Sequence, residues 1–235
     1  MRVVNHKPRI TNHESRATKL ILALDVDSFE KAIYFVNLLY PKIKIFKVGS
    51  QLFTGCGPRI ADFIHKKGGE VFLDLKFHDI PNTAANAVSQ AARLKVKMLT
   101  LHISGGPEML KAAVKAAKDE SLDPKQKRPL LVGVTVLTSQ ETKSGEVLGL
   151  AKLGLECGLD GIVCSAQEVM SLREKLGKDF IIVTPGIRPR QTGTDDQKRI
   201  ATAQEAIAAG SDFLVVGRPI LEAKEPLKAL REIWK

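Results

Sequence analysis

The sequence contains few cysteines and few aromatic residues. Its three cysteines, Cys56, Cys157 and Cys164, lie far apart and form no Cys-x-x-Cys pair. Disulfide frameworks and structural zinc sites need paired cysteines, so the pattern favours neither and suits a reducing compartment. Aromatic residues make up 5% of the chain, and no run of lysine and arginine is interleaved with them. Nucleic-acid binding is therefore the weaker interpretation of a net charge of +10, and an anionic substrate is the stronger one.

Long hydrophobic runs are also missing. No apolar run approaches the roughly 20 residues of a membrane-spanning helix, and the polar, basic start of the chain lacks the apolar centre of a secretory signal. We therefore expect no membrane contact and a cytoplasmic location. Residues 1–17 show no hydrophobic periodicity and predict a flexible basic extension, followed by one catalytic domain over residues 18–235.

Short apolar runs alternate with amphipathic segments along the rest of the chain. The runs predict strands at Leu20–Val26, Ile43–Gly49, Glu70–Phe77, Val96–His102, Leu130–Val136, Gly161–Ser165, Phe180–Thr184 and Phe213–Gly217. The intervening segments predict helices at Ser28–Tyr40, Gly57–Lys67, Pro81–Leu94, Pro107–Lys118, Val147–Cys157, Gln167–Leu176, Thr202–Ala209 and Ile220–Ile233. Eight strand–helix pairs indicate an α/β fold, a single (β/α)8 TIM barrel with a parallel eight-stranded core. An open doubly wound sheet is less favoured, because no Gly-x-Gly-x-x-Gly follows the first strand.

One stretch, Asp74–Thr83, combines a strand end with several charges. Alternation along the strand places Asp74 and Lys76 on one face. Burying such ions costs several kcal/mol each before pairing offsets the loss. The pair is therefore either a structural salt bridge or part of a functional site. Asp79 follows just past the strand, and Pro81 suits the first turn of a helix.

Polar residues stand at the other predicted strand ends as well. Active sites of such barrels form at the carboxyl-terminal ends of the strands, where this chain has Asp25 and Lys47. A phosphate often binds after strands seven and eight, where Arg188 and Gly217-Arg218 stand. Arg188 and Gln197 flank a polar, glycine-containing loop that is suited to closing over such a phosphate.

With these motifs on five or more strand ends, the chain from about Leu20 onward resembles the orotidine 5′-phosphate decarboxylase family. The resemblance implies decarboxylation of orotidine 5′-monophosphate to uridine 5′-monophosphate in pyrimidine biosynthesis, without metal or cofactor. It implies that Lys76 donates a proton to carbon 6 of the ring. Lys47, Asp74 and Asp79 are implied to complete an alternating charge array. Asp79 is implied to come from the neighbouring subunit, which makes the expected protein a homodimer with shared active sites.

The resemblance also implies a set of substrate-binding residues. Asp25 and Lys47 match ribose-binding positions, Thr83 belongs to a substrate-contacting stretch, and Thr138 matches a pyrimidine contact. The remaining members of the expected set are Pro185, Arg188, Gln197, Gly217 and Arg218.

Two other functions remain open at this point. Magnesium-dependent sugar-phosphate lyases such as hexulose-phosphate synthase share much of the Asp-x-Lys-x-x-Asp stretch, but they have an acidic metal ligand at the end of strand two. Lys47 occupies that position here, and an ammonium group would repel magnesium. A non-catalytic barrel that binds phosphate or nucleic acid is the second alternative, and it would show strongly salt-dependent binding to nucleic acid.

Overall fold

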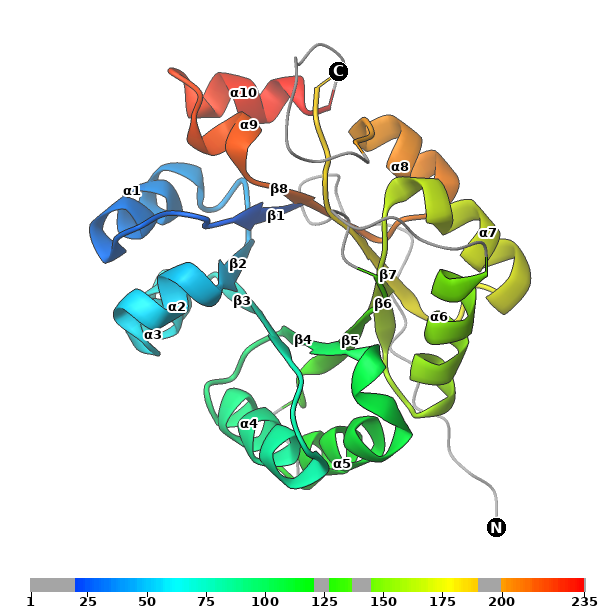
Figure 1. The fold of residues 1–235 in the computed structure, drawn as a ribbon. Coiled ribbons are helices and arrows are strands. Elements are labelled where there is room, and N and C mark those ends of the chain that lie inside the picture. The colour runs from blue at the N-terminus through cyan, green and yellow to red at the C-terminus, as the bar shows by residue number, and fades with distance from the viewer. Residues whose placement is uncertain (1–19, 121–126, 137–144, 190–199, 235) are drawn as a thin grey trace.

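The computed structural model describes residues 20–120, 127–136, 145–189 and 200–234. Within these ranges eight parallel strands form a closed barrel in sequence order, and β8 pairs with β1 to close it (Figure 1). Helices surround the strands on the outside. The (β/α)8 barrel expected from the sequence is confirmed.

The elements follow the predicted order. The strands are β1 (Leu20–Ala23), β2 (Ile45–Gly49), β3 (Glu70–Phe77), β4 (Met98–His102), β5 (Leu130–Val134), β6 (Gly161–Val163), β7 (Ile181–Thr184) and β8 (Phe213–Val216). The helices are α1 (Phe29–Leu39), α2 (Ser50–Cys56), α3 (Arg59–Lys66), α4 (Pro81–Arg93), α5 (Gly106–Asp119), α6 (Glu146–Glu156), α7 (Ala166–Leu176), α8 (Ala203–Ala209), α9 (Arg218–Leu221) and α10 (Pro226–Glu232). Most strands are shorter than predicted because the residues at their ends turn into loops.

Two helical regions differ from the prediction. Helix α2 begins directly after β2, where glycines at 49, 55 and 57 favour a loop in the sequence pattern. The helix forms because Leu52 is buried in the core. The single helix predicted at Ile220–Ile233 is wrong, since the chain forms α9 and α10 with a short break between them. Pro226 begins α10, and proline is tolerated in the first turn of a helix but not in its interior.

The interior of the barrel changes from apolar to charged along the strands. Alternating side chains of each strand point into the barrel. Toward the amino-terminal end these are Ile21, Ile45, Phe72, Met98, Val132, Ile181 and Phe213. Two residues further along the strands come Ala23, Lys47, Asp74, Thr100, Val134, Val183 and Val215. The charges of this second layer therefore lie above a hydrophobic layer, on the side of the barrel formed by β2 and β3.

Two partly buried ion pairs hold the amino-terminal end of the barrel. Asp160, just before β6, accepts hydrogen bonds from Arg128 at 2.7 Å and from a backbone amide of β5 at 2.8 Å. Asp212, just before β8, accepts from Arg173 at 2.6 Å and from a backbone amide of β7 at 2.8 Å. Each carboxylate thus joins two strands at the end of the barrel opposite the polar strand ends.

None of the helices in the described ranges is long and apolar enough to cross a membrane. Cys56, Cys157 and Cys164 are free thiols, as their spacing predicts. The predicted extension at 1–17 lies outside the described residues.

Candidate active site

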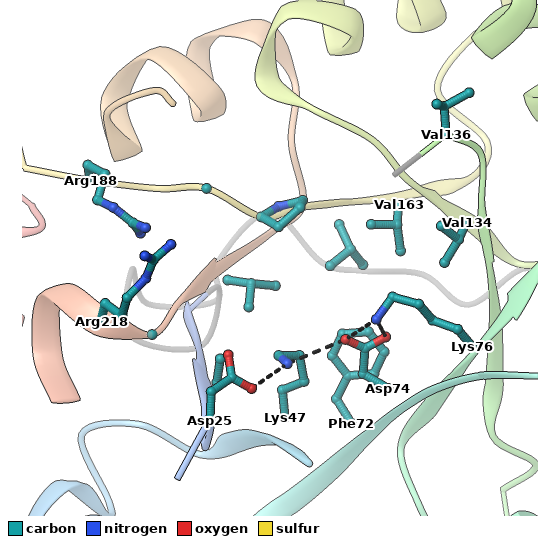
Figure 2. Close-up of a pocket in the computed structure, with 16 residues that line it drawn as sticks. Asp25, Lys47, Phe72, Asp74, Lys76, Val134, Val136, Val163, Arg188 and Arg218 are labelled. Atoms are coloured by element: carbon teal, nitrogen blue, oxygen red, sulfur yellow. Dashed lines mark hydrogen bonds and ion pairs between the residues drawn. The ribbon is translucent and has the colours of Figure 1, made fainter. Parts of the chain in front are cut away.

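A cavity of about 260 Å³ lies at the carboxyl-terminal end of the barrel (Figure 2). Four charged residues form one side, and two arginines lie at one end. Val134, Val136 and Val163 lie on the opposite side, and Val183 also lines the cavity. The cavity therefore offers charge to one face of a ligand and apolar contact to the other.

The charged side is a row of alternating sign. Lys47 Nζ is 2.9 Å from Asp25 Oδ1 and 3.4 Å from Asp74 Oδ2. Lys76 Nζ donates hydrogen bonds to both oxygens of Asp74, at 2.9 and 3.0 Å. The side chains of Lys47 and Asp74 are each 12% exposed, whereas Asp25 at the end of the row is 53% exposed. The two inner charges, Lys47 and Asp74, are thus held largely out of water, whereas Lys76 at the other end of the row is 36% exposed.

The backbone of β3 is irregular where it carries these charges. Leu73 lies opposite Leu99 of β4, but Phe77 lies opposite Leu101, so four steps along β3 match two steps along β4. Lys76 has a φ of 51°, in the left-handed region that residues other than glycine rarely adopt. Such a conformation costs about 1–3 kcal/mol and occurs preferentially at functional sites. The strained backbone therefore makes Lys76 a candidate functional residue of this site.

The charges of the row shift the pKa values of its inner members. Burial acts to raise the pKa of Asp74, but the charges of Lys47 and Lys76 and hydrogen bonds from Lys76 and Thr100 outweigh it. The pKa of Asp74 therefore lies below its ordinary value. Burial likewise acts to lower the pKa of Lys47, but Asp74 and Asp25 outweigh it and raise that pKa above the ordinary value. Asp74 and Lys47 are accordingly both charged at neutral pH.

The two arginines bring positive charge to the other end of the cavity. Arg188 is buried, and its backbone amide donates to the carbonyl of Ala201 at 2.9 Å. Arg218 follows Gly217 and begins helix α9. Their guanidinium groups point toward one another (Figure 2). Two cations directed at one region favour an anionic group between them.

The structure brings eight of the expected site residues together around this cavity. They are Asp25, Lys47, Asp74, Lys76, Pro185, Arg188, Gly217 and Arg218. Asp79 and Thr83 are exposed and do not line the cavity of their own chain. Asp79 Oδ1 accepts a hydrogen bond from the backbone amide of Ile80 at 2.7 Å. Thr138 and Gln197 lie outside the described residues.

Two groups of residues near the charges were not expected from the sequence. The valine side is formed by Val134, Val136, Val163 and Val183. Three of these valines occupy inward-facing positions of β5, β6 and β7, and Val136 follows the end of β5 by two residues. Strand alternation could have identified most of these positions. Thr100 of β4 is fully buried and hydrogen-bonded to both Asp74 and Lys76. Nothing in the sequence indicates this role, because a single threonine in an apolar strand does not show which residues of the neighbouring strand it contacts.

Comparisons with known proteins point to one family. Residues 18–233 match the model of the "Orotidine 5'-phosphate decarboxylase / HUMPS family". The orotidine 5′-phosphate decarboxylase of Saccharophagus degradans is 48% identical over 92% of this chain and 93% of its own. That of Vibrio cholerae is 49% identical, with 92% and 96% covered. A solved orotidine 5′-phosphate decarboxylase from Lactobacillus acidophilus superposes with a TM-score of 0.81 at 35% identity, over 92% of this chain and 97% of that one.

Proposed function

The chain belongs to the orotidine 5′-phosphate decarboxylase / HUMPS family, and we propose that Lys76 is the proton donor of its reaction. The reaction is the decarboxylation of orotidine 5′-monophosphate to uridine 5′-monophosphate and carbon dioxide, a step of pyrimidine biosynthesis. The enzyme is thus a carboxy-lyase. The observation that carries the proposal for Lys76 is the row of four alternating charges along one side of the cavity.

The chemistry requires a cation beside carbon 6 of the pyrimidine ring. The bond between carbon 6 and the carboxylate breaks, carbon dioxide leaves, and the electron pair stays on carbon 6. Lys76 stabilises that charge and then transfers a proton from Nζ to carbon 6, after which the amine regains a proton from solvent. Asp74 holds the ammonium through hydrogen bonds to both of its oxygens. A preorganised charge of this kind acts where charge develops in the transition state.

One lysine does not account for a large acceleration. An ammonium about 4 Å from a unit negative charge contributes roughly 4 kcal/mol at an effective dielectric constant near 20. The largest enzymatic accelerations need about 20 kcal/mol. The remainder comes from the fixed geometry of the charge row and from binding energy of the distant phosphate.

The two ends of the cavity suggest how the nucleotide lies in it. The phosphate binds between Arg188 and Arg218, at the end remote from Lys76 (Figure 2). Asp25 and Lys47 lie between these ends and hydrogen-bond the ribose hydroxyls. The pyrimidine then lies beside Lys76, with the valine side against one face of the ring.

A sugar-phosphate lyase that depends on magnesium is the competing activity within this barrel family. Its metal ligand at the end of β2 is replaced here by Lys47, which lies between two carboxylates at 2.9 and 3.4 Å. An ammonium group in that place supplies a cation of its own and repels a second one. The charge row therefore favours decarboxylation without metal.

The proposed site is shared between two subunits of a homodimer. Asp79 and Thr83 lie outside the cavity of their own chain, around the start of α4. Between them Ile80 is 67% exposed, so this part of the surface offers an apolar side chain for contact with a partner. In a two-fold dimer these residues reach the cavity of the other subunit. The cytoplasmic location, the extension at 1–17 and the roles of Thr138 and Gln197 stay predictions.

The test is to follow the loss of orotidine 5′-monophosphate absorbance with purified protein in excess chelator. We expect undiminished turnover, and Lys76→Ala should remove nearly all of it while nucleotide binding stays measurable. The matched control is Lys97→Ala, because Lys97 pairs with Glu70 at 2.7 Å at the opposite end of the barrel.

Two results would contradict the proposal. Turnover that chelation abolishes and magnesium restores would favour the lyase chemistry. A Lys76→Ala enzyme that keeps more than about a tenth of the native turnover would limit the contribution of Lys76 to about 1.4 kcal/mol, too little for the proton donor.

A further inference from the structure

Thr100 lies directly beside the reactive pair without lining the cavity. It occupies the inward-facing position of β4 after Met98, next to the irregular stretch of β3, and is 1% exposed. Its hydroxyl oxygen is 2.9 Å from Lys76 N and 3.0 Å from Asp74 Oδ1. One buried hydroxyl group thus contacts both residues that carry the proposed chemistry.

The direction of these two hydrogen bonds is fixed by the groups involved. The amide of Lys76 can only donate, so the hydroxyl oxygen accepts from it. Asp74 is ionised and can only accept, so the hydroxyl proton points at Oδ1. Lys76 Nζ donates to the same carboxylate at 2.9 Å. The hydrogen bonds therefore close a ring that begins at the backbone of Lys76 and returns to the end of its side chain.

The ring lies where regular strand pairing is interrupted. Between the pairs Leu73–Leu99 and Phe77–Leu101, β3 has two residues more than β4. The amide of Lys76 takes the Thr100 hydroxyl as its acceptor in this stretch. Lys76 also has the strained φ of 51°, and such a conformation persists only where surrounding contacts hold it. Thr100 provides one of those contacts.

We propose that Thr100 is a positioning residue of the decarboxylase, which sets the place of the Lys76 ammonium relative to Asp74 and to carbon 6 of the substrate. The inference rests on the proposed role of Lys76 as proton donor. Thr100 does not touch the substrate. It acts by holding the backbone of Lys76 and by fixing the carboxylate that orients its ammonium group.

The test compares two substitutions that separate the hydroxyl from the shape of the side chain. Thr100→Val keeps the shape and removes the hydroxyl, and we expect kcat to fall by about 10- to 100-fold, the usual effect of losing a hydrogen bond to a charged group. The KM should stay within about threefold, because no substrate contact is lost. Thr100→Ser keeps the hydroxyl and should restore kcat to within about threefold of the native value.

A second buried threonine provides the control. The hydroxyl of Thr184 lies 2.6 Å from Ser211 Oγ and contacts no member of the charge row. Thr184→Val should lower stability and leave kcat unchanged. Circular dichroism and uridine 5′-monophosphate binding establish that each variant is folded, and Thr100→Ala takes the place of Thr100→Val if the valine variant does not fold.

The outcomes separate this inference from the proposed function. A hydroxyl-free variant with kcat within about twofold of native, or a serine variant as impaired as the valine variant, would overturn the role of Thr100. If Lys76→Ala is inactive while Thr100→Val is normal, only the positioning role fails. If Lys76→Ala remains active, the proposed proton donor is wrong, and the role of Thr100 fails with it.

Discussion

Replacing Lys47 with methionine removes the ammonium group that lies between two carboxylates and keeps a side chain of similar length. Asp25 is half-exposed, so its pairing with Lys47 contributes at most about 1 kcal/mol. Asp74 is buried and loses an ammonium at 3.4 Å. Asp74 keeps Lys76 and Thr100 as hydrogen-bond donors.

The expected cost follows from these contacts. Two unit charges 3.4 Å apart interact by about 5 kcal/mol at an effective dielectric constant of 20. The substitution also removes the cost of keeping the Lys47 ammonium out of water, several kcal/mol on the same scale. We therefore expect a net loss of about 2 kcal/mol in the free energy of unfolding at neutral pH.

The loss should depend on pH with a definite sign. The pKa of Asp74 lies below its ordinary 3.8, so its stabilising contribution is present above pH 3.8 and is lost as the pH falls through the lower folded value. The pKa of Lys47 lies above its ordinary 10.5, so that contribution is present below pH 10.5 and is lost as the pH rises through the higher folded value. Without Lys47 the burial of Asp74 is less well offset, and the pKa of Asp74 rises. Protonation then relieves part of the cost, so the variant should be less destabilised near pH 4.5 than near pH 8.

Urea unfolding followed by the fluorescence of Trp234, the single tryptophan, measures this free energy. The control is Lys31→Met, because Lys31 lies 2.7 Å from Asp27 but both side chains are exposed. Water screens that pair, so its removal should have no measurable effect despite the shorter distance. Equal losses in the two variants, or a loss for Lys47→Met that is the same at both pH values, would refute the reasoning.

Two further predictions concern the substrate and the dimer. Arg218→Ala should weaken the binding of uridine 5′-monophosphate by about 10- to 100-fold in calorimetry and barely affect uridine, since the contact that we propose between its guanidinium and the nucleotide is to the phosphate; equal losses would place Arg218 outside the phosphate site. Lys76→Ala and Asp79→Ala proteins should each be nearly inactive, and their mixture should recover about a quarter of native activity, because about half of the dimers are hybrids with one intact site. No recovery after subunit exchange verified by mass spectrometry would mean that Asp79 serves its own subunit.

The sequence predicts the barrel well because the fold depends on a repeated pattern. Each apolar run is too short for a helix and is followed by an amphipathic segment, and this order leaves few arrangements of the chain. Strand β3 is predicted at Glu70–Phe77 with the bounds that the structure has. Helix α2 is missed because the glycines around it favour a loop in the sequence pattern, whereas the burial of Leu52, which favours the helix, is visible only in the folded structure. Breaks such as the one before Pro226 depend on where two helices pack, and a periodic pattern does not specify that.

The site is predicted less completely than the fold. Alternation along β3 correctly places Asp74 and Lys76 on one side of the strand, and both reach the cavity. The irregular register of β3 and the left-handed backbone of Lys76 have no sequence signal, since lysine does not favour that conformation. Thr100 is missed for a related reason. Its role arises from the neighbouring strand, and only the folded barrel brings the two strands together.

The ion pairs at the amino-terminal end of the barrel have a consequence for evolution. Asp160 and Asp212 join neighbouring strands there through Arg128 and Arg173, and none of these four residues lines the cavity. Changes in the loops that follow the strands therefore leave these ion pairs intact. During evolution, the loops at the carboxyl-terminal end of such a barrel can change to accept new substrates while the amino-terminal end keeps the chain folded. Proteins that share this fold can therefore differ in the reactions that they catalyse.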